Sequence, residues 1–515
     1  MTELKHVAKF LHYPSLLLSI LLIKAAALVW LIQSGAIGLG PDEAQYWTWS
    51  QSLSPGYYSK PPGIAWQIFL GTALFGDTEL GVRFFSLVIG FAIPLVIYSM
   101  GKKGGISERA SFFSAIAFAL SPMGFLSSLF AITDGGSVLF FTMALLTLYQ
   151  GIYRGKIDYT RAGLFVFAGA LFKWVTYYLW IFALPLYLLR RQKGERFFLG
   201  VAISLLALIP SLIWNISHDF VTFLHVYYQA GSKGDIAPNK ELISLKSFAD
   251  FMGAEAALVS PLLFVLLAIS LVFLAAKSKS FERAPAFLGI STLATLAVFG
   301  ALSFFMKIQG NWCDFIYPAA FLFMGHVFDS ARGRKYLVAG SALSVLLTGY
   351  VLSLPFQKDS PLALQYRQNP LKHNLGWNSF EEALKKAGYD EKAHFLFAPK
   401  YQTVSLLSFY GPGKKRAYFF NLFGARLNQF SFWKGMKEER KGQSGFFVIV
   451  ENAPHIETER QNIAATVKSL EPYFQKVTFR GEYPLYTSRE NPAKVAFVYF
   501  AENFNGEEPL PPKKY

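Results

Sequence analysis

Long apolar runs separated by short polar segments fill the first two thirds of the chain, and the pattern changes after residue 356. A helix that crosses a bilayer needs about 20 apolar residues. Eleven segments approach that length, at 13–33, 80–100, 110–127, 133–150, 162–173, 175–189, 197–214, 256–276, 284–305, 314–330 and 336–356. The pattern predicts a polytopic α-helical membrane domain over residues 1–356 with about 11 or more spans.

Residues 162–189 are too few for two full spans, yet basic residues at both of their ends indicate the same side of the membrane. We expect a hairpin of two short helices with Lys173 and Trp174 at its tip, partway through the bilayer. Broken backbone at that depth requires surrounding protein or a water-filled cavity, and an ionisable residue there suggests function. The alternative is one tilted helix in which Lys173 snorkels to the surface.

Basic residues are concentrated in alternate loops. Lys5 and Lys9 precede the first span, and the loops that follow on the same side carry further lysines and arginines, whereas the opposite loops carry few. The positive-inside rule places the basic side in the cytoplasm. Eleven spans that start there predict a C-terminus outside, in the periplasm of a double-membrane bacterium. The outer loops include residues 34–79 and a long polar segment, 215–254.

From residue 357 the hydrophobic pattern is that of a small globular domain. Buried strands are predicted at 394–398, 417–420, 445–450 and 495–500, and an amphipathic helix at 457–470. Ser379 and Glu382 have the spacing of a capping box at the start of a second helix. Strands that alternate with helices favour an α/β domain over residues 357–515.

Composition agrees with this division and excludes several classes of protein. Hydrophobic residues make up 53% of the 515 residues and charged residues 16%, against about 25% charged in soluble domains. The single cysteine, Cys313, excludes a disulfide framework and a multi-cysteine zinc site. The net charge of +16 is explained by cytoplasmic loops and anionic lipid, so no nucleic acid partner is expected. Walker, GxGxxG, GxSxG and HExxH motifs are absent.

The first outer loop carries the strongest candidate chemistry. Asp42 and Glu43 are adjacent carboxylates just beyond a span, and Lys60 precedes two prolines that stiffen the chain. Tyr46 and Tyr58 lie close by in the sequence and are candidates for substrate binding. Aromatic residues alone would indicate an interfacial belt, but the carboxylates and the lysine favour an acid–base site at the level of the lipid headgroups.

Two further outer positions are candidates. Asp134 begins a span and either caps that helix or lines the site. The short loop 306–314 either forms a plain turn or binds substrate, with Lys307 suited to a phosphate and with amide and indole groups suited to sugar hydroxyls, from Gln309, Asn311 and Trp312.

These motifs, in this order, resemble the bacterial GT-C membrane glycosyltransferases, in particular the group of protein O-mannosyltransferases and lipid A aminoarabinose transferases. The resemblance covers most of the chain and begins with the Asp-Glu stretch PDEAQYWTWS and the Lys-Pro-Pro stretch YYSKPPGIAW. It continues through SPMGFLSSLFAITD, GALFKW, IPSLIWNISHDFVTFLHV and GNWCDFIYPA. The C-terminal stretches LLSFYGPG and RLNQFSFW are also similar.

The resemblance implies a polyprenyl-phosphate sugar as donor, such as an undecaprenyl-phosphate sugar, used at the outer face of the membrane. It implies that Asp42 is the catalytic carboxylate with Glu43 as its neighbour. Lys60 would meet the donor phosphate, and Lys173 and Asp134 would line the same cavity. Aminoarabinose transferases carry a metal-associated glutamate where this chain has Ser59, which argues against a bound divalent metal and against the aminoarabinose assignment.

A lipid-phosphate leaving group already activates the sugar, so the absence of a nucleotide site suits this chemistry. We therefore expect an inverting glycosyltransferase whose acceptor is an envelope glycolipid, namely lipid A or the core sugars of lipopolysaccharide. Protein O-mannosylation is the alternative among enzymes. A flippase for lipid-linked sugars is the alternative of another class, disfavoured because transporters show broken helices in both halves and this sequence predicts one broken pair.

Overall fold

The computed structural model describes residues 12–190, 195–230, 243–452 and 456–509. They form two compact units, which we describe separately. The first unit contains Met1–Val29, Lys60–Gln67 and Arg83–Gly349, and the second contains Trp30–Ser59, Ile68–Val82 and Tyr350–Tyr515. Lys5, Lys9 and the end of the C-terminal tail lie outside the described residues.

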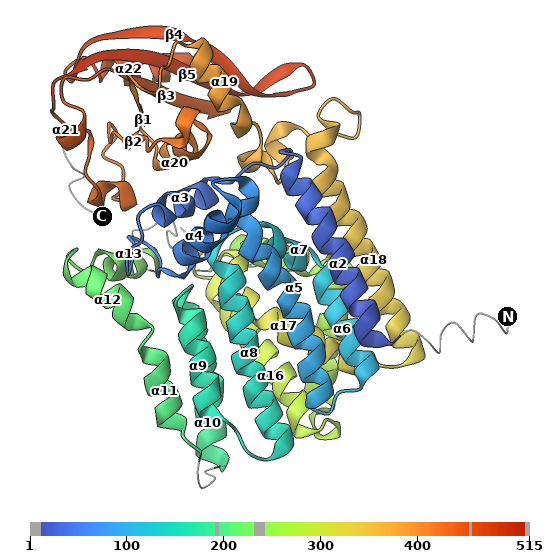
Figure 1. Cartoon of the computed structure of the whole chain (residues 1–515). Helices are drawn as coiled ribbons and strands as arrows, with labels where there is room; N and C mark the ends of the chain where they lie inside the picture. Colours follow the sequence, from blue (N-terminus) through green and yellow to red (C-terminus); the bar gives the residue numbers. More distant parts are fainter. Residues whose placement is uncertain (1–11, 191–194, 231–242, 453–455, 510–515) are drawn as a thin grey trace. The chain divides into compact units, whose positions relative to one another are not determined.

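The first unit is a helical bundle (Figure 1). Its helices, some of which continue into the second unit, are α2 (Tyr13–Gln33), α5 (Glu79–Lys103), α6 (Glu108–Leu120), α7 (Pro122–Leu129), α8 (Thr133–Arg154), α9 (Tyr159–Ala170), α10 (Leu179–Arg190), α11 (Phe197–Leu205), α12 (Leu208–Ile216), α13 (Val221–Ala230), α14 (Leu245–Val259), α15 (Pro261–Ala276), α16 (Arg283–Ser303), α17 (Tyr317–Val327) and α18 (Ala331–Ser353).

Six helices in the described part of the chain are long and apolar enough to cross a membrane. They are α2, α5, α8, α11 with α12, α16 and α18, and two bent pairs raise the number to as many as eight. A polytopic helical membrane protein is thus confirmed, while the count of 11 spans stays a prediction. The expectation of one broken pair is wrong, because α6 and α7 meet at 63° and α14 and α15 at 107°.

A buried lysine stabilises the break between α6 and α7. Lys24 of α2 donates from Nζ to the carbonyl oxygens of Ala119 at 2.8 Å and Gly124 at 2.7 Å, and to Ser128 Oγ at 2.9 Å. The last carbonyls of a helix have no partner within the helix, and a cation near a helix C-terminus is favourable. Lys24 therefore satisfies Ala119 O in the last turn of α6 and links it to the first turn of α7.

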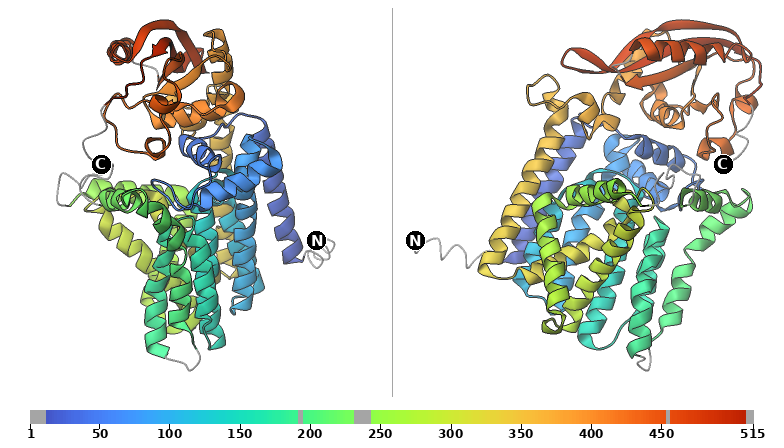
Figure 2. Two further views of the ribbon diagram at one scale, coloured as in Figure 1. Left: turned by 60° about the vertical axis from the view of Figure 1, so that its left-hand side comes forward. Right: turned by 180° about the vertical axis from the view of Figure 1, so that it is seen from behind.

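The two short helices predicted between residues 162 and 189 are present. Helix α9 ends at Ala170, the chain turns through Lys173, and the 3₁₀-helix η1 (Trp174–Tyr178) leads into α10. In Figures 1 and 2 the chain leaves one end of the bundle along α9 and returns to the same end along α10. The Gly63 N–H donates to Leu171 O at 2.7 Å, and a Cβ at Gly63 would lie 2.6 Å from that oxygen. Only glycine permits this approach of the Lys-Pro-Pro stretch to the hairpin tip.

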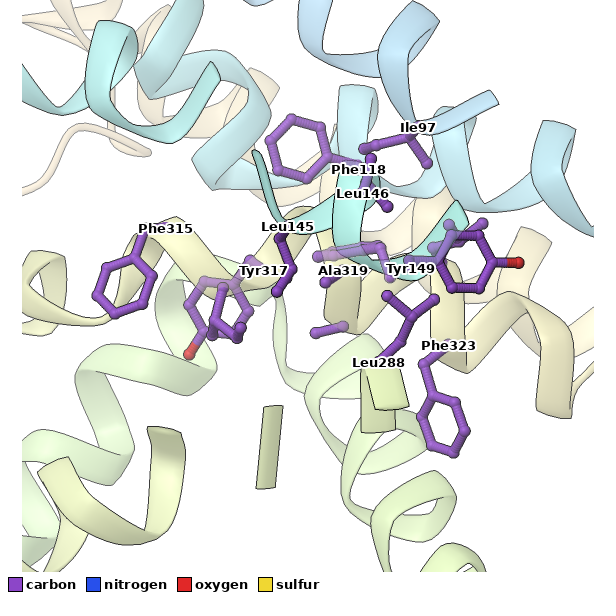
Figure 3. Close-up of a cluster of buried hydrophobic side chains, with 14 of the residues drawn as sticks. Ile97, Phe118, Leu145, Leu146, Tyr149, Leu288, Phe315, Tyr317, Ala319 and Phe323 are labelled. Carbon is purple, nitrogen blue, oxygen red and sulfur yellow. The ribbon is translucent and has the colours of Figure 1, made fainter. Parts of the chain in front are cut away.

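A large apolar core joins the bundle. Figure 3 shows its centre, where Phe118, Leu145 and Leu146 lie near Tyr317 and Ala319. These side chains are at most 2% exposed. The polar segment 215–254 is not the long structureless loop that the sequence suggested, because α13 and most of α14 form within it.

The second unit contains a five-stranded mixed sheet of order β2-β1-β3-β5-β4. The strands are β1 (Phe395–Ala398), β2 (Tyr418–Phe419), β3 (Gly445–Asn452), β4 (Phe474–Ser488) and β5 (Asn491–Phe504). Strand β1 is parallel to β2 and β3, whereas β5 is antiparallel to β3 and β4. Helix α22 (Ile456–Lys468) packs Ile463 against one face of the sheet. Strands β4 and β5 form a long hairpin whose tip projects beyond the other strands (Figure 2).

The four predicted strands and the helix at 457–470 are confirmed, and two elements were missed. Strand β4 lies at the edge of the sheet, and only two of its 15 residues are buried. With Gly481 and Pro484 inside it, it lacks the apolar pattern of a buried strand. Helix α20 (Tyr401–Tyr410) is almost wholly buried and shows no polar face. The predicted capping box is wrong, because Ser379 makes no side-chain cap bond to α19 (Phe380–Lys386).

Part of the first outer loop belongs to the second unit. Helix α3 (Pro41–Ser50) packs against α20, with Trp47 edge-on to Phe409 at a centroid distance of 5.0 Å. Helix α4 (Gly63–Phe75) begins in the first unit and ends in the second. The remaining helix of the second unit is the short α21 (Met436–Glu439).

Candidate active site

Asp42 lies at the start of α3, one residue after the proline that opens the helix, and its side chain is exposed. Glu43 is only 1% exposed, and its Oε2 accepts the Gly40 N–H at 2.9 Å. Glu43 therefore fixes the first turn of α3. A helix N-terminus also favours negative charge, so the carboxylate of Asp42 is presented to solvent from a rigid and electrostatically favourable position.

The turn before Asp42 is fixed by residues more than 300 positions away in the chain. Gly38 exchanges two hydrogen bonds with Asn374, from its N–H to Asn374 O at 2.9 Å and from Asn374 Nδ2 to its own carbonyl at 3.0 Å. The Leu39 N–H donates to Tyr410 Oη at 2.6 Å. A Cβ at Gly38 would lie 2.8 Å from that hydroxyl oxygen, so this contact requires glycine.

Sequence reasoning missed these partners, because residues in the C-terminal part carry no local signal that they serve the first loop. His373 was missed as well. Burial, Lys372 and Lys494 lower its pKa, and Asp42 opposes them. His373 is therefore uncharged at neutral pH and lies within electrostatic range of the candidate base.

The two candidate tyrosines of the first loop are buried rather than open to a ligand. Tyr46 is 5% exposed and packs edge-on against Trp49 at 4.9 Å. Tyr58 is 3% exposed, and its N–H donates to the side chain of Gln429 at 2.8 Å. Their predicted role in substrate binding stays a prediction, and their packing gives both a structural role.

In the first unit, Asp134, Lys173 and Asn311 form one hydrogen-bonded cluster, which we call the inner cluster. Lys173 Nζ donates to Asp134 Oδ1 at 2.7 Å and to Asn311 O at 3.1 Å. Asn311 Nδ2 donates to the same carboxylate oxygen at 3.2 Å. The side chains of the ion pair are 17% and 11% exposed. The sequence predicted these three residues from separate loops, and the fold brings them together.

Lys60 belongs to the same unit and lies close enough to Asp134 to interact with it electrostatically. Gly63, three residues after Lys60, contacts the hairpin tip and so fixes the position of this stretch. Because Lys173 already pairs with Asp134, a donor phosphate that approached Lys173 would compete with that carboxylate. The predicted roles of Lys60 and Lys173 at the donor phosphate stay predictions.

Two buried acids of this region were not among the predicted site residues. Asp314, 6% exposed, lies close enough to Asp134 and Lys173 to interact with both electrostatically. Glu255, 0% exposed, accepts from Tyr317 Oη and from Cys313 Sγ. The signal was available, since a carboxylate within an apolar helix is unusual.

The loop 306–314 contains three further candidate residues. Lys307 and Gln309 are exposed, and Trp312 packs partly against the apolar core. Their roles in substrate binding stay predictions. Over the described residues, no three His, Cys, Asp or Glu side chains gather in a way that could hold a metal ion.

The sequence is similar to those of known membrane glycosyltransferases. Residues 59–214 match the family of dolichyl-phosphate-mannose-protein mannosyltransferases. The chain is 31% identical over 232 residues to a lipid A galacturonosyltransferase, RgtD, of Rhizobium johnstonii, covering 43% of this chain and 47% of that protein. It is 28% identical over 217 residues to an undecaprenyl phosphate-α-4-amino-4-deoxy-L-arabinose arabinosyl transferase of Pseudomonas paraeruginosa, covering 38% and 40%. The matches thus span less than half of each relative.

The fold as a whole is similar to that of ArnT from Cupriavidus metallidurans. The apo crystal structure superposes with a TM-score of 0.59 and 15% identity, over 93% of this chain and 97% of ArnT. The structure bound to undecaprenyl phosphate gives 0.61 and 14%, over 94% and 98%. Together with the six apolar spans, these likenesses confirm the predicted resemblance. The chain is thus a multi-pass inner-membrane protein with the GT-C fold of ArnT.

Proposed function

We propose that the protein is an inverting glycosyltransferase that moves a sugar from a polyprenyl-phosphate donor to lipid A or the core sugars of lipopolysaccharide. The observation that carries the proposal is the exposed carboxylate of Asp42 at the fixed start of α3. The polar, nearly buried inner cluster of the first unit adds to it. The names of the relatives, a lipid A galacturonosyltransferase and aminoarabinose transferases, support it.

The reaction needs one base and one cation. Asp42 accepts the proton of an acceptor hydroxyl as the oxygen forms a bond to the anomeric carbon on the face opposite the phosphate. The bond from the anomeric carbon to the phosphate oxygen breaks, and polyprenyl phosphate leaves with the electron pair. The configuration inverts because there is a single displacement. Lys60 stabilises the negative charge that grows on the departing phosphate.

The inner cluster fixes polar groups of the first unit, to which Lys60 also belongs. Lys173 joins the hairpin tip to Asp134 on α8 and to the loop that carries Asn311. Fixed polar groups of this kind cost no reorganisation when charge develops. We assign Lys173 and Asp134 primarily to this positioning, with donor contact as their second role.

Purified protein incubated with a polyprenyl-phosphate sugar and lipid A tests the proposal. We expect polyprenyl phosphate to be released only when the acceptor is present, with one sugar added to lipid A by mass spectrometry. Movement of intact donor across liposomes, with no release, would instead establish a flippase. The match of residues 59–214 to protein mannosyltransferases makes a serine- and threonine-containing peptide the second acceptor to test.

Replacing Lys60 with alanine is expected to lower kcat and to raise the apparent KM for the donor. A lysine that only binds the donor equally in ground and transition states would raise KM alone. Arginine should restore part of the activity, because it keeps the charge but not the compact ammonium. The control is Lys246→Ala, which removes an exposed lysine of α14. Wild-type kinetics of Lys60→Ala would contradict a role at the phosphate.

We further propose that residues 357–515 lie in the periplasm. The support is the excess of basic residues in the loops assigned to the cytoplasm. A reporter fused after Tyr515 that is active only in the periplasm is expected to be active. Activity of a reporter that works only in the cytoplasm would contradict the odd number of crossings.

A further inference from the structure

The second unit contains a large groove that no part of the proposed mechanism uses. Its volume is about 970 Å³, at the upper end of the range of about 300–1,000 Å³ for ligand sites. We call it the outer groove, and the side chains that characterise it are Phe75, Asp77, Glu79, Glu381, Tyr410 and Lys414.

The groove is suited to a sugar with free hydroxyl or amino groups. It combines three carboxylates with a half-exposed aromatic ring, since Phe75 is 41% exposed. Carboxylate oxygens accept hydrogen bonds from hydroxyl and ammonium groups, and the ring offers an apolar face to the sugar carbons. The same carboxylates repel a phosphate.

The one lysine of the groove does not reverse this preference. Lys414 Nζ lies 3.7 Å from the centroid of the Phe409 ring and donates to Phe409 O at 2.8 Å. Burial lowers its pKa, an effect that Asp77, Glu79 and Glu381 oppose. The ammonium is therefore directed onto the protein. Glu381 is paired with Lys385 at 2.6 Å, so Asp77 and Glu79 make the groove acidic.

Hydrogen bonds connect the groove to the helix that carries Asp42. Tyr410 lines the groove, donates to Glu79 Oε1 at 2.6 Å and accepts the Leu39 N–H, three residues before Asp42. Trp47 of α3 donates from Nε1 to Asp77 Oδ1 at 2.7 Å. Two of the three carboxylates thus contact the structure that positions the candidate base.

The place of the groove along the chain fits a membrane-anchored ligand. Gln33, which lines it, is the last residue of the spanning helix α2, and Glu79 is the first residue of the spanning helix α5. The ends of spanning helices lie at the level of the lipid headgroups. A glycolipid whose acyl chains remain in the bilayer would present its sugars there.

We propose that the outer groove binds a hydroxyl-bearing sugar of the acceptor glycolipid and discriminates against phosphate on that sugar. The proposal rests on the proposed glycosyltransferase function and deepens it. It assigns Asp77 and Glu381 to acceptor specificity, whereas Lys60 serves the donor.

Two lipid acceptors test the discrimination, namely bis-phosphorylated lipid A and the same lipid A after enzymatic removal of its phosphates. We expect the wild-type protein to use the dephosphorylated lipid with a kcat/KM roughly tenfold higher, a ratio that one or two hydrogen bonds to charged groups can give. An equal or higher value for the phosphorylated lipid would overturn the proposal. If neither lipid nor the peptide causes release of polyprenyl phosphate, the proposed function is overturned as well.

The helix α19 offers a matched pair of variants. Glu381 and Glu382 each form an exposed ion pair with the lysine four residues on, both at 2.6 Å, but only Glu381 lines the groove. Glu381→Gln is expected to raise the acceptor KM about fivefold to tenfold with the donor KM unchanged, and Glu382→Gln to change neither. Equal effects of the two variants, or a change in the donor KM alone, would refute the assignment. Asp77→Asn should act in the same direction as Glu381→Gln.

Discussion

The Asp42→Asn variant is expected to fold, to enter the membrane and to transfer sugar about 10²–10⁴ times more slowly than the wild-type protein. Asparagine has nearly the same shape and can occupy the same exposed place in the first turn of α3, but it cannot accept the proton of the acceptor hydroxyl. We expect the fold to be retained because Glu43, Asn374 and Tyr410 fix the turn before Asp42. Turnover with a defined polyprenyl-phosphate sugar measures the loss.

The control for this variant is Asp250→Asn, which neutralises an exposed carboxylate of α14 and should leave turnover unchanged. Glu43→Gln should cost less than Asp42→Asn, because an amide oxygen can still accept the Gly40 N–H. Near-normal turnover by a well-folded Asp42→Asn protein would remove Asp42 from the mechanism and leave His373 as the nearby group to examine.

Replacing Lys173 with methionine is expected to destabilise the protein strongly. The change leaves Asp134 nearly buried without its cation, and the loss of one partner of a buried ion pair costs about 3–5 kcal/mol. The double variant Lys173→Met with Asp134→Leu removes both charges and should be markedly more stable than Lys173→Met alone. The midpoint temperature of unfolding in detergent is measured for the wild-type protein, for Lys173→Met and Asp134→Leu alone, and for the double variant.

The comparison tests whether the two positions are coupled. If the two side chains interact, the loss of stability in the double variant differs from the sum of the losses in the two single variants. If they are independent, it equals that sum. Additive losses would show that the 2.7 Å contact between Lys173 and Asp134 contributes nothing to stability.

The membrane helices and most of the C-terminal sheet could be predicted because each depends on a local pattern. A run of about 20 apolar residues is visible without knowledge of its neighbours, and the buried strand β3 is a short apolar run with turn signals on both sides. Strand β4 could not be found in this way. It is an exposed edge strand with a proline and a glycine, and it is ordered by its long pairing with β5.

The candidate site shows the same division. Asp42 and Lys60 stand out because their neighbours in sequence are unusual, and Lys173 because it interrupts an apolar segment. Tyr410 and Asn374 lie in ordinary surroundings, and their contact with Gly38 and Leu39 is a product of tertiary structure. No periodicity or spacing marks a residue whose partner is more than 300 positions away.

The bonds from Asn374 and Tyr410 to the turn before Asp42 also set the order in which the protein becomes competent during its synthesis. The first loop leaves the ribosome long before residues 374–410 exist, and domains fold as they emerge. During that interval a nascent chain holds the spans and Lys60, but the backbone next to Asp42 lacks the groups that fix it. The proposed sugar transfer would thus begin only after residues 374–410 have been translated and folded onto the first loop.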